Sequence, residues 1–300
     1  MKIAVFGAGA LGSLLGGLLS TKHDVTLIGR RAHVDAINLK GLELSGIVNE
    51  VVWPSARTDA TGLEPQDIVL VTVKAYDTRK AATYMSPLIG KGTIVASLQN
   101  GLDNIKTLHD FYDQRTVGGV TSCGATYLSP GRVRFAGKGD LIFGSTAGRK
   151  DLAESVCFAF GGTGIPCQST NDIMAEVWMK VIVNASINPI TALVRHENAC
   201  IEEDVELKEL ARRVCEETVL VAKASGVRLP RCDPFSKVMG VVAATRLNRS
   251  SMLQDVEAGK RTEIDEITGA VVNEARRFEI ATPTNETLWR LVKSLGSVRP

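Results

Sequence analysis

The sequence predicts an α/β protein in two domains, with a parallel sheet in residues 1–168 and an all-α domain in residues 169–300. Two patterns support this division. In the first half, short apolar runs alternate with helical stretches, which is typical of βαβ units and a parallel sheet. After Thr170, apolar residues recur at helical spacing in almost every long segment. A length of 300 residues also fits about two domains.

The composition and charge are those of an ordinary globular protein. Hydrophobic residues make up 44% of the chain and charged residues 23%, which excludes disorder and fibrous structure as the main class. The 35 basic and 33 acidic side chains leave a net charge of +2, too small an excess to gather a polyanion. We therefore do not expect nucleic acid as a partner. The oligomeric state stays open, with a homodimer among the alternatives.

The cysteines are spread along the chain, with no CxxC pair and no histidine close by. This spacing argues against a zinc site and against a disulfide framework. We therefore expect no metal, a reducing cytoplasmic location, and cysteines that act as small buried hydrophobes. The six positions are Cys123, Cys157, Cys167, Cys200, Cys215 and Cys232.

The N-terminal stretch Ile3–Thr21 has no charged residue and superficially resembles a signal peptide or membrane span. Its five glycines favour another interpretation, because they would weaken a continuous membrane helix. A short apolar strand, a tight glycine turn and a new helix account for all of them. We therefore expect neither secretion nor insertion into a membrane.

The strands of the parallel sheet are expected at Ile3–Phe6, Val25–Ile28, Ile68–Val73, Thr93–Leu98 and Thr116–Ser122. The pattern then changes. Tyr127–Phe135 and Asp140–Gly144 are short strand-like runs, and Pro130-Gly131 marks a turn inside the first of them. We expect antiparallel edge strands there.

The second half has no internal repeat and no glycine-serine linker, so its helices should form one packed bundle. Ser251 followed by Gln254, and Thr262 followed by Asp265, both fit a capping box at a helix start. Gly259 between them fits a helix stop. The surface between the two domains is where we expect a small ligand to bind.

Residues 7–12 form a GxGxxG motif directly after an expected strand and at the start of an expected helix, which is the context that the motif requires. Gly7 permits the sharp turn, Gly9 lets backbone amides approach a pyrophosphate, and Gly12 lets helix and strand pack closely. The alternative is a glycine-rich packing turn without a ligand. We expect the dinucleotide to bind at Gly7, Ala8, Gly9, Ala10, Leu11 and Gly12.

The choice of cofactor is read at the end of the second strand. An NAD enzyme usually offers Asp or Glu there, whereas this chain has Gly29-Arg30-Arg31. An arginine can form forked, charge-assisted hydrogen bonds to a 2'-phosphate. The sequence therefore favours NADP(H), with Arg30 on the phosphate. The alternative is that both arginines are solvated surface charges.

Lys74 and Asn100 each follow an apolar strand, at the carboxyl edge where open α/β sheets bind ligands. We expect both to line the ligand crevice. Two alternatives stay open: Lys74 as a solvent-facing loop lysine, and Asn100 as part of an Asn-Gly turn or a helix N-cap.

Lys180, Asn184 and Asn188 follow one another at i, i+4 and i+8 in an apolar helical segment, which places them on nearly one face. Buried amides and a lysine need polar partners. The face should therefore meet a polar cleft, unless it is the solvated stripe of an amphipathic helix. If a nicotinamide reduces a ketone there, Lys180 is the candidate to stabilise the oxyanion and donate its proton.

Ser251 and Glu263 stand at the starts of two expected helices. A serine among the free amides of a helix N-terminus can hold a carboxylate. A glutamate in a first turn is favoured as the anion, and it can accept a hydroxyl proton or pair with Lys180. The alternative is that both residues only cap and complement their helices.

As an ordered set over nearly the whole chain, these residues resemble the ketopantoate reductase family, the 2-dehydropantoate 2-reductases of pantothenate biosynthesis. The matching motifs are Gly7-Ala-Gly-Ala-Leu-Gly12, Val73-Lys-Ala75, Leu98-Gln-Asn-Gly101, Trp178-x-Lys-x-x-x-Asn184, Ile187-Asn-Pro189, Ser250-Ser-Met-Leu-Gln-Asp255 and Thr262-Glu-Ile-Asp265.

The resemblance implies a Rossmann-type domain followed by an all-α domain like that of 6-phosphogluconate dehydrogenase, with NADPH and a 2-oxo acid as ligands. It implies that Lys180 is the general acid and that Glu263 holds the primary hydroxyl of the substrate and orients the lysine. It also assigns Lys74 and Asn100 to the cofactor side of the cleft. The substrate contacts implied are Asn100, Asn184, Asn188, Asn198 and Ser251.

Two positions depart from the pattern of the family. Asp103 stands where glycine is common, and Phe135 stands where histidine is frequent. The expected reaction is NADPH-dependent reduction of 2-dehydropantoate to pantoate. The alternatives are reduction of another branched 2-oxo acid on the same fold, and a non-catalytic NADP(H) sensor.

Overall fold

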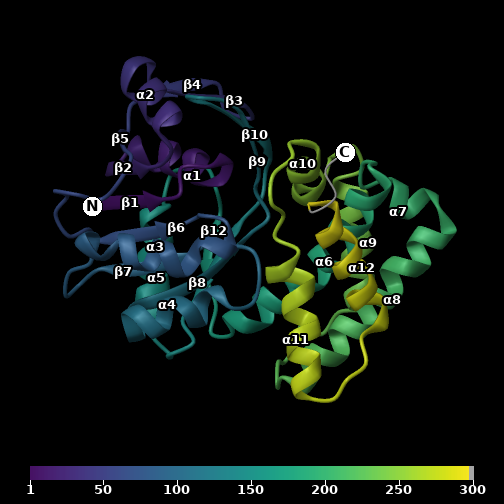
Figure 1. Ribbon diagram of the computed structural model, residues 1–300. Helices are drawn as coiled ribbons and strands as arrows, with labels where there is room; N and C mark the ends of the chain where they lie inside the picture. The colour runs from purple at the N-terminus through teal and green to yellow at the C-terminus, as the bar shows by residue number, and fades with distance from the viewer. Residues whose placement is uncertain (297–300) are drawn as a thin grey trace. The chain divides into compact units, whose positions relative to one another are not determined.

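The computed structural model describes residues 1–296 and divides the chain into two compact units (Figure 1). Unit 1 contains Met1–Gln99 and Asn104–Ile173. Unit 2 contains the short segment Asn100–Asp103 and the described residues from Met174 on. The first unit is α/β and the second is helical, which confirms the predicted fold class.

The larger sheet of unit 1 has eight strands. They are β1 (Lys2–Phe6), β2 (Asp24–Ile28), β5 (Ser55–Arg57), β6 (Ile68–Val71), β7 (Ile94–Ser97), β8 (Thr116–Thr121), β11 (Leu141–Gly144) and β12 (Cys167–Ser169). Their order is β12-β11-β8-β7-β6-β1-β2-β5, and every neighbouring pair is parallel except the antiparallel pair of β11 and β8. The parallel sheet expected from the apolar runs is confirmed.

The strand order reverses direction at β1, because β2 lies on one side of it and β6 on the other. Ligands of open α/β sheets bind at such a switch point, beyond the carboxyl ends of the strands. The glycine-rich turn that follows Phe6 therefore lies at the position in unit 1 where a ligand is expected.

A second sheet in unit 1 has the order β4-β3-β10-β9, with β3 (Leu42–Gly46), β4 (Glu50–Val52), β9 (Gly124–Ser129) and β10 (Arg132–Gly137). Strands β9 and β10 form an antiparallel hairpin that turns at Pro130-Gly131, as the sequence predicts. Strand β10 also pairs in parallel with β3. Buried side chains of both sheets and of helix α1 (Ala10–Ser20) belong to one hydrophobic core.

Four more α-helices belong wholly to unit 1: α2 (Arg31–Lys40), α3 (Thr78–Tyr84), α4 (Asn104–Tyr112) and α5 (Lys150–Ala159). Short 3₁₀ turns η1 (Ala75–Asp77), η2 (Ser86–Leu88) and η3 (Asp113–Arg115) connect them to the strands. The alternation of strand and helix is what gives the larger sheet its parallel connections.

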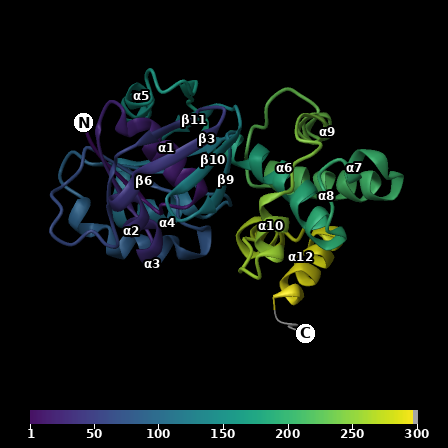
Figure 2. The same ribbon diagram turned by 90° about the horizontal axis from the view of Figure 1, so that it is seen from above.

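Unit 2 consists of helices that pack around a second hydrophobic core. The helices are α6 (Ile173–Val194), α7 (Cys200–Glu203), α8 (Val205–Ala224), α9 (Pro234–Ala244), α10 (Ser251–Glu257), the π-helical turn η4 (Asp265–Gly269), α11 (Ala270–Arg277) and α12 (Pro283–Leu295). Helix α6 runs through the middle of this unit in both views (Figure 1, Figure 2). It is long and apolar enough to cross a membrane by length and composition alone, but 78% of its apolar window is buried inside the structure, as expected of a core helix.

Both capping-box predictions in unit 2 are wrong in detail. Helix α10 is capped by Ser250, whose Oγ accepts a hydrogen bond from the Leu253 N–H at 3.1 Å, so Ser251 is the first helical residue. Thr262 caps no helix, because the backbone first forms the π-helical turn η4 and continues directly into α11. The predicted stop at Gly259 is confirmed, since α10 ends at Glu257 and Gly259 has a φ of +62°.

Candidate functional site

The glycine-rich turn between β1 and α1 is shaped by tight backbone contacts. A Cβ at Gly7 would lie 2.5 Å from the Val73 nitrogen, and one at Gly12 would lie 2.3 Å from the Gly7 carbonyl oxygen. Neither position tolerates a side chain. The amides of Gly7 and Ala8 both donate to the Ile28 carbonyl, at 3.0 and 2.8 Å, which fixes the turn against the end of β2.

Gly9 differs from these two glycines, because packing within the protein does not explain it. A Cβ there would meet only the Gly7 carbonyl oxygen, at 4.0 Å. The space beside Gly9 is thus kept clear at the start of α1, where first-turn amides point outward and there is no acidic residue in the first turn. This open turn with a helix N-terminus fits a phosphate-bearing ligand.

Arg30 stands at the end of β2, next to the same turn. It is exposed and forms the N-cap position of α2. The residue before it, Gly29, lies so close to the turn that its Cβ would be 2.8 Å from the Ala8 Cβ. The structure of unit 1 therefore places an exposed guanidinium-bearing residue beside the glycine-rich turn.

His33 is a buried residue beside this turn that sequence reasoning did not identify. Its Nδ1 accepts a hydrogen bond from the Gly131 N–H at 2.9 Å, and its Nε2 lies 2.9 Å from Ser13 Oγ. Because Nδ1 accepts, the neutral ring carries its proton on Nε2 and donates it to Ser13. Burial lowers the pKa of His33 below its usual value. The ring thus joins α2, α1 and the β9–β10 turn as a neutral group.

Lys74 lies in the loop after β6, at the same sheet edge as the glycine-rich turn, and it is partly buried. Two side chains brace this edge. The hydroxyl of Thr72 donates to the Gly7 carbonyl at 2.8 Å. The Gln99 amide donates to the Val73 carbonyl at 3.0 Å and to Thr78 Oγ1 at 2.7 Å. The bracing role of Gln99 depends on contacts that the sequence pattern alone does not show.

Asn100 belongs to unit 2, although the residues before Asn100 and after Asp103 belong to unit 1. Its Nδ2 donates to Glu263 Oε2 at 3.2 Å, and its Oδ1 accepts from Asn184 Nδ2 at 3.4 Å. A hydrogen-bonded chain therefore runs from Asn184 through Asn100 to Glu263. Three of the residues that the sequence singles out are brought together here, from three separate parts of the chain.

Lys180 and Glu263 both lie at this chain of hydrogen bonds. Lys180 is partly buried and stands one helical turn before Asn184 on α6. Glu263 is only 6% exposed, and its backbone carbonyl accepts from the Ile267 N–H at the start of the turn that leads into η4. A buried carboxylate held by an amide donor is suited to orient a neighbouring polar group.

A second carboxyl group, Glu266, lies beside Glu263. Its Oε1 accepts from Arg261 at 3.2 Å, while its Oε2 is buried without a hydrogen-bond partner in the structure. Burial raises the pKa of Glu266 above its usual value. The sequence analysis does not single out Glu266, because its position in a charged, helical stretch is typical of a surface residue.

Asn188, Ser251 and Asn198 lie further along α6 and at the start of α10. Asn188 is buried one turn after Asn184, and Thr191 Oγ1 joins its carbonyl to Ser250 Oγ at 3.1 and 2.8 Å. Ser251 itself is exposed. The structure thus brings the end of α6 against the start of α10, with Ser250 rather than Ser251 at the contact.

Asn198 is 6% exposed and is tied to the segment that leads into α10. Its backbone N–H donates to the Asn248 carbonyl at 3.0 Å, and its Nδ2 donates to Thr245 Oγ1 at 2.8 Å. Its Oδ1 is buried without a hydrogen-bond partner in the structure. A buried, unpaired amide oxygen is uncommon in a protein interior and is often found at a functional site.

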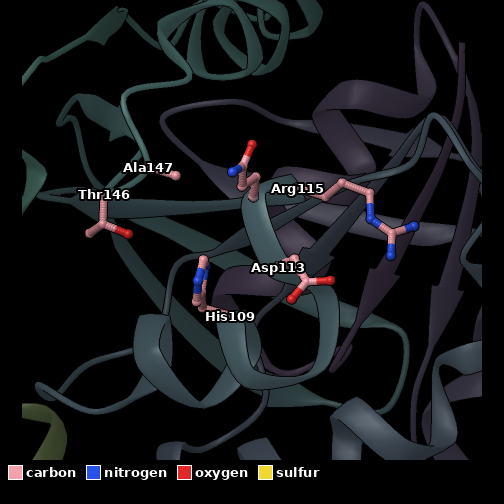
Figure 3. Close-up of a pocket in the computed structure, with 6 residues that line it drawn as sticks. His109, Asp113, Arg115, Thr146 and Ala147 are labelled. Atoms are coloured by element: carbon pink, nitrogen blue, oxygen red, sulfur yellow. The ribbon is translucent and has the colours of Figure 1, made fainter.

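An open pocket lies elsewhere in unit 1 and contains none of the residues that the motifs single out. It lies between the end of α4, η3 and the loop before α5 (Figure 3). The residues lining it are His109, Asp113, Gln114, Arg115, Thr146 and Ala147. The candidate site is therefore defined by the motifs and the hydrogen-bonded side chains, and not by this pocket.

Comparisons with known proteins cover nearly the whole chain. The family model described as "Ketopantoate reductase PanE/ApbA" matches residues 3–148, and the model of its C-terminal domain matches residues 172–296. A 2-dehydropantoate 2-reductase of Pyrococcus horikoshii is 37% identical over 99% of this chain and 98% of its own.

Solved structures agree with the family models. The crystal structure of a PanE/ApbA family ketopantoate reductase from Ralstonia eutropha JMP134 has a TM-score of 0.92 and 33% identity, and the match covers 99% of both chains. A ternary structure of a D-mandelate dehydrogenase with NADH and anilino(oxo)acetate has the same fold, with a TM-score of 0.92 at 24% identity and 99% coverage of both chains. The chain belongs to the ketopantoate reductase family of oxidoreductases.

Proposed function

We propose that the protein is an NADPH-dependent 2-dehydropantoate 2-reductase, which forms pantoate for the biosynthesis of pantothenate and coenzyme A. The observation that carries this proposal is the hydrogen-bonded chain from Asn184 through Asn100 to Glu263, with Lys180 one helical turn away. It combines an ammonium donor, amides and a buried carboxylate, which are the groups that a reaction on a hydroxylated 2-oxo acid requires.

Each residue of the chain has a defined part in the proposed reaction. NADPH, when bound, supplies a hydride to the ketone carbon of the substrate. As the hydride arrives, negative charge develops on the carbonyl oxygen, and the Lys180 ammonium stabilises that charge and donates a proton from Nζ to the oxygen. Glu263 accepts a hydrogen bond from the primary hydroxyl of the substrate and helps to orient Lys180. Asn100 holds Glu263 in position through its amide.

The remaining substrate contacts are proposed along α6 and α10. Asn184 and Asn188 present amides from successive turns of α6. The exposed Ser251 and the first amides of α10 offer donors to the substrate carboxylate. Asn198, with its buried and unpaired Oδ1, contributes a further contact.

We propose that unit 1 binds the cofactor at the six residues of the glycine-rich turn, with Lys74 and Asn100 at the nicotinamide side. The open space beside Gly9 and the start of α1 fit the pyrophosphate. The exposed Arg30 beside the turn fits a 2'-phosphate, which is the basis for proposing NADP(H) rather than NAD(H). A cytoplasmic location is part of the same proposal, since NADPH supplies reductive biosynthesis there and the described cysteines are all free thiols.

The proposal is tested by following the loss of NADPH absorbance with 2-dehydropantoate as substrate. Lys180→Ala should lower kcat by about 10² to 10⁴, the usual contribution of general acid catalysis, while NADPH still binds. The matched control is Lys223→Ala, which removes an exposed lysine from the last turn of α8 and should leave kcat unchanged. Turnover in Lys180→Ala equal to that in the control would remove Lys180 from the mechanism.

The fold does not decide between substrates, because a D-mandelate dehydrogenase has the same fold. A panel of 2-oxo acids with and without a primary hydroxyl makes the decision. The proposal predicts the highest kcat/KM for 2-dehydropantoate, and Glu263→Gln should reduce that preference because the charged acceptor for the hydroxyl is lost. Equal kcat/KM with an oxo acid that lacks the hydroxyl would favour a reductase of another branched 2-oxo acid.

Arg30→Ala tests the choice of cofactor. The Kd for NADPH should rise about tenfold or more, while the Kd for NADH stays nearly constant, because only NADPH carries the phosphate that the guanidinium binds. The neighbouring exposed Arg31 provides the matched control, since Arg31→Ala removes the same charge one residue later. Equal losses for both cofactors in Arg30→Ala would contradict the phosphate assignment.

A further inference from the structure

Two cysteines meet at one edge of unit 1, away from the residues of the proposed reaction. Cys157 lies in the last turn of α5, and Cys167 is the first residue of the edge strand β12. The Cys167 thiol donates to the Cys157 sulfur, and the two Sγ atoms are 2.7 Å apart. Both residues are partly buried, so each thiol is packed against the core and still accessible to a small reagent.

The elements that carry the two thiols are held together by contacts that do not involve sulfur. Strand β12 pairs in parallel with β11, with Leu141 opposite Cys167. The end of α5 is fixed by His23, whose ring nitrogen donates to the Ala159 carbonyl at 2.8 Å, and by Lys22, which donates to the Gly161 carbonyl at 3.2 Å. The approach of the sulfurs is therefore set by the fold. A disulfide bond of about 2.05 Å requires only a small further movement of the side chains.

We propose that Cys157 and Cys167 are a redox modification site that forms a reversible intramolecular disulfide by exchange with low-molecular-weight disulfides. The sequence analysis predicts only inert, buried thiols at these positions. Ten residues separate the two cysteines in the chain, and the pair forms because α5 and β12 pack against each other.

The two thiols have different parts in the exchange. The hydrogen bond from Cys167 lowers the pKa of Cys157, and the same bond together with burial raises the pKa of Cys167. Cys157 is therefore the attacking thiolate. It attacks one sulfur of the small disulfide, forms a mixed disulfide and expels one small thiolate.

The second step closes the bond within the protein. Cys167 loses its proton to solvent, attacks Cys157 Sγ and expels the second small thiolate. Overall, the two cysteines lose two electrons and two protons, and the small disulfide is reduced to two thiols. A small dithiol reverses both steps.

The test uses the full-length protein with oxidised glutathione as the probe, followed by alkylation of the remaining thiols and mass spectrometry. Trypsin releases both cysteines on one peptide, Asp151–Lys180, because no Lys or Arg lies between those ends. After oxidation this peptide should be lighter by two hydrogens than the reduced peptide and should take up no alkyl group. After reduction it should take up two. Cleavage after Phe158 or Phe160 should then yield two fragments that separate only on reduction.

The exposed Cys232 reports independently that the probe has reacted, because it lies on a different tryptic peptide. Two alkyl groups on Asp151–Lys180 once Cys232 is fully modified would overturn the proposal. Glutathione retained on this peptide in the wild-type protein would also overturn it, because Cys167 would then have failed to complete the exchange.

Two single variants separate the roles of the thiols. Cys167→Ser keeps a hydroxyl donor beside Cys157 and should retain one glutathione on Cys157, since the second sulfur is gone. Cys157→Ser should be modified at Cys167 about tenfold more slowly or less readily still. A faster reaction at Cys167 than at Cys157 would reverse the assignment of the attacking thiol and contradict the mechanism.

Discussion

At the scale of single residues, Gly101 determines whether the site in unit 2 is formed. Its φ is +101°, in the region that favours glycine, and a Cβ there would lie 2.6 Å from the Glu266 carbonyl oxygen. The neighbouring Asn100 forms the middle of the hydrogen-bonded chain. The contact of Gly101 with Glu266 therefore sets the distance between Asn100 and Glu263.

Gly101→Ala should damage activity more than it damages the fold. The methyl group must move the Asn100–Asp103 segment away from Glu266, which breaks the chain of hydrogen bonds, and we expect kcat/KM for 2-dehydropantoate to fall about tenfold or more. Strain and displacement should cost about 1–3 kcal/mol of the free energy of unfolding. Steady-state kinetics and urea unfolding measure the two effects.

Gly259→Ala is the matched control for this prediction. Gly259 is also in unit 2 and has a φ of +62°, but no atom lies within 4 Å of the position of its added Cβ. The variant therefore carries backbone strain without displacing a neighbour. Normal kcat/KM in both variants would show that the contact at Gly101 does not position the site.

The residues of this site could be predicted one by one from the sequence, but their contacts could not. The strand end before Asn100 and the helical spacing of Lys180 and Asn184 are local signals. The transfer of Asn100 into unit 2 depends on Gly101 packing against Glu266, which is separated from it by most of the chain. For the same reason, no local pattern indicates that His33 joins three elements or that Gln99 braces the sheet edge.

At the scale of elements, the parallel sheet and the long helices follow from patterns that local physics dictates. Buried strands are apolar along their whole length, and the glycine-rich turn has its own spacing. Helix starts are less well determined. Ser250 and Ser251 are identical in type and adjacent, and what selects Ser250 as the cap of α10 is its contact with Thr191 on α6, a tertiary interaction. The π-helical turn at Asp265–Gly269 likewise has no signal in the sequence.

The adjacent serines make it possible to separate stability from substrate binding. Ser250→Ala removes the cap of α10 and the partner of the buried Thr191 hydroxyl, and it should lower the free energy of unfolding by about 1–3 kcal/mol. Ser251→Ala should change that free energy by less than about 0.5 kcal/mol, because its side chain is exposed. Urea unfolding followed by circular dichroism measures both.

The kinetic effects of the two variants should be ranked in the opposite way. If Ser251 holds the substrate carboxylate, the KM of Ser251→Ala for 2-dehydropantoate should rise several-fold at nearly constant stability. A KM in Ser251→Ala equal to that of the wild-type protein would return Ser251 to a purely helical role.

At the scale of the whole molecule, stability rests on the two hydrophobic cores and little on charge. The ion pairs of the structure, such as Arg132 with Glu43 and Arg276 with Glu286, lie at the surface, where each contributes about 0–1 kcal/mol. The pH dependence of folding near neutrality should therefore depend on buried titratable groups. His33 and Glu266 are two such groups, and burial shifts the pKa of each toward its neutral form.

The two groups have opposite effects on stability as pH changes. The pKa of Glu266 is raised in the folded protein, so this residue favours folding at low pH and loses that contribution as pH rises above about 4.5. The pKa of His33 is lowered, so the unfolded chain binds the proton more tightly than the folded protein does. The contribution of His33 is therefore complete above pH 6.5 and is lost as pH falls below that value. A variant at His33 is needed to isolate its part.

His33→Asn should flatten the pH dependence of the free energy of unfolding below pH 6.5. In the wild-type protein, protonation of the ring removes the acceptor of the Gly131 N–H, and His33 alone should contribute a slope of up to about 1.4 kcal/mol per pH unit. Urea unfolding between pH 5 and pH 8 measures the slope. His196→Asn, which changes an exposed histidine, should keep the wild-type slope. If His33→Asn kept that slope as well, acid destabilisation would have to arise from the carboxyl groups, and the neutral His33 ring would not be the group that makes unit 1 sensitive to pH.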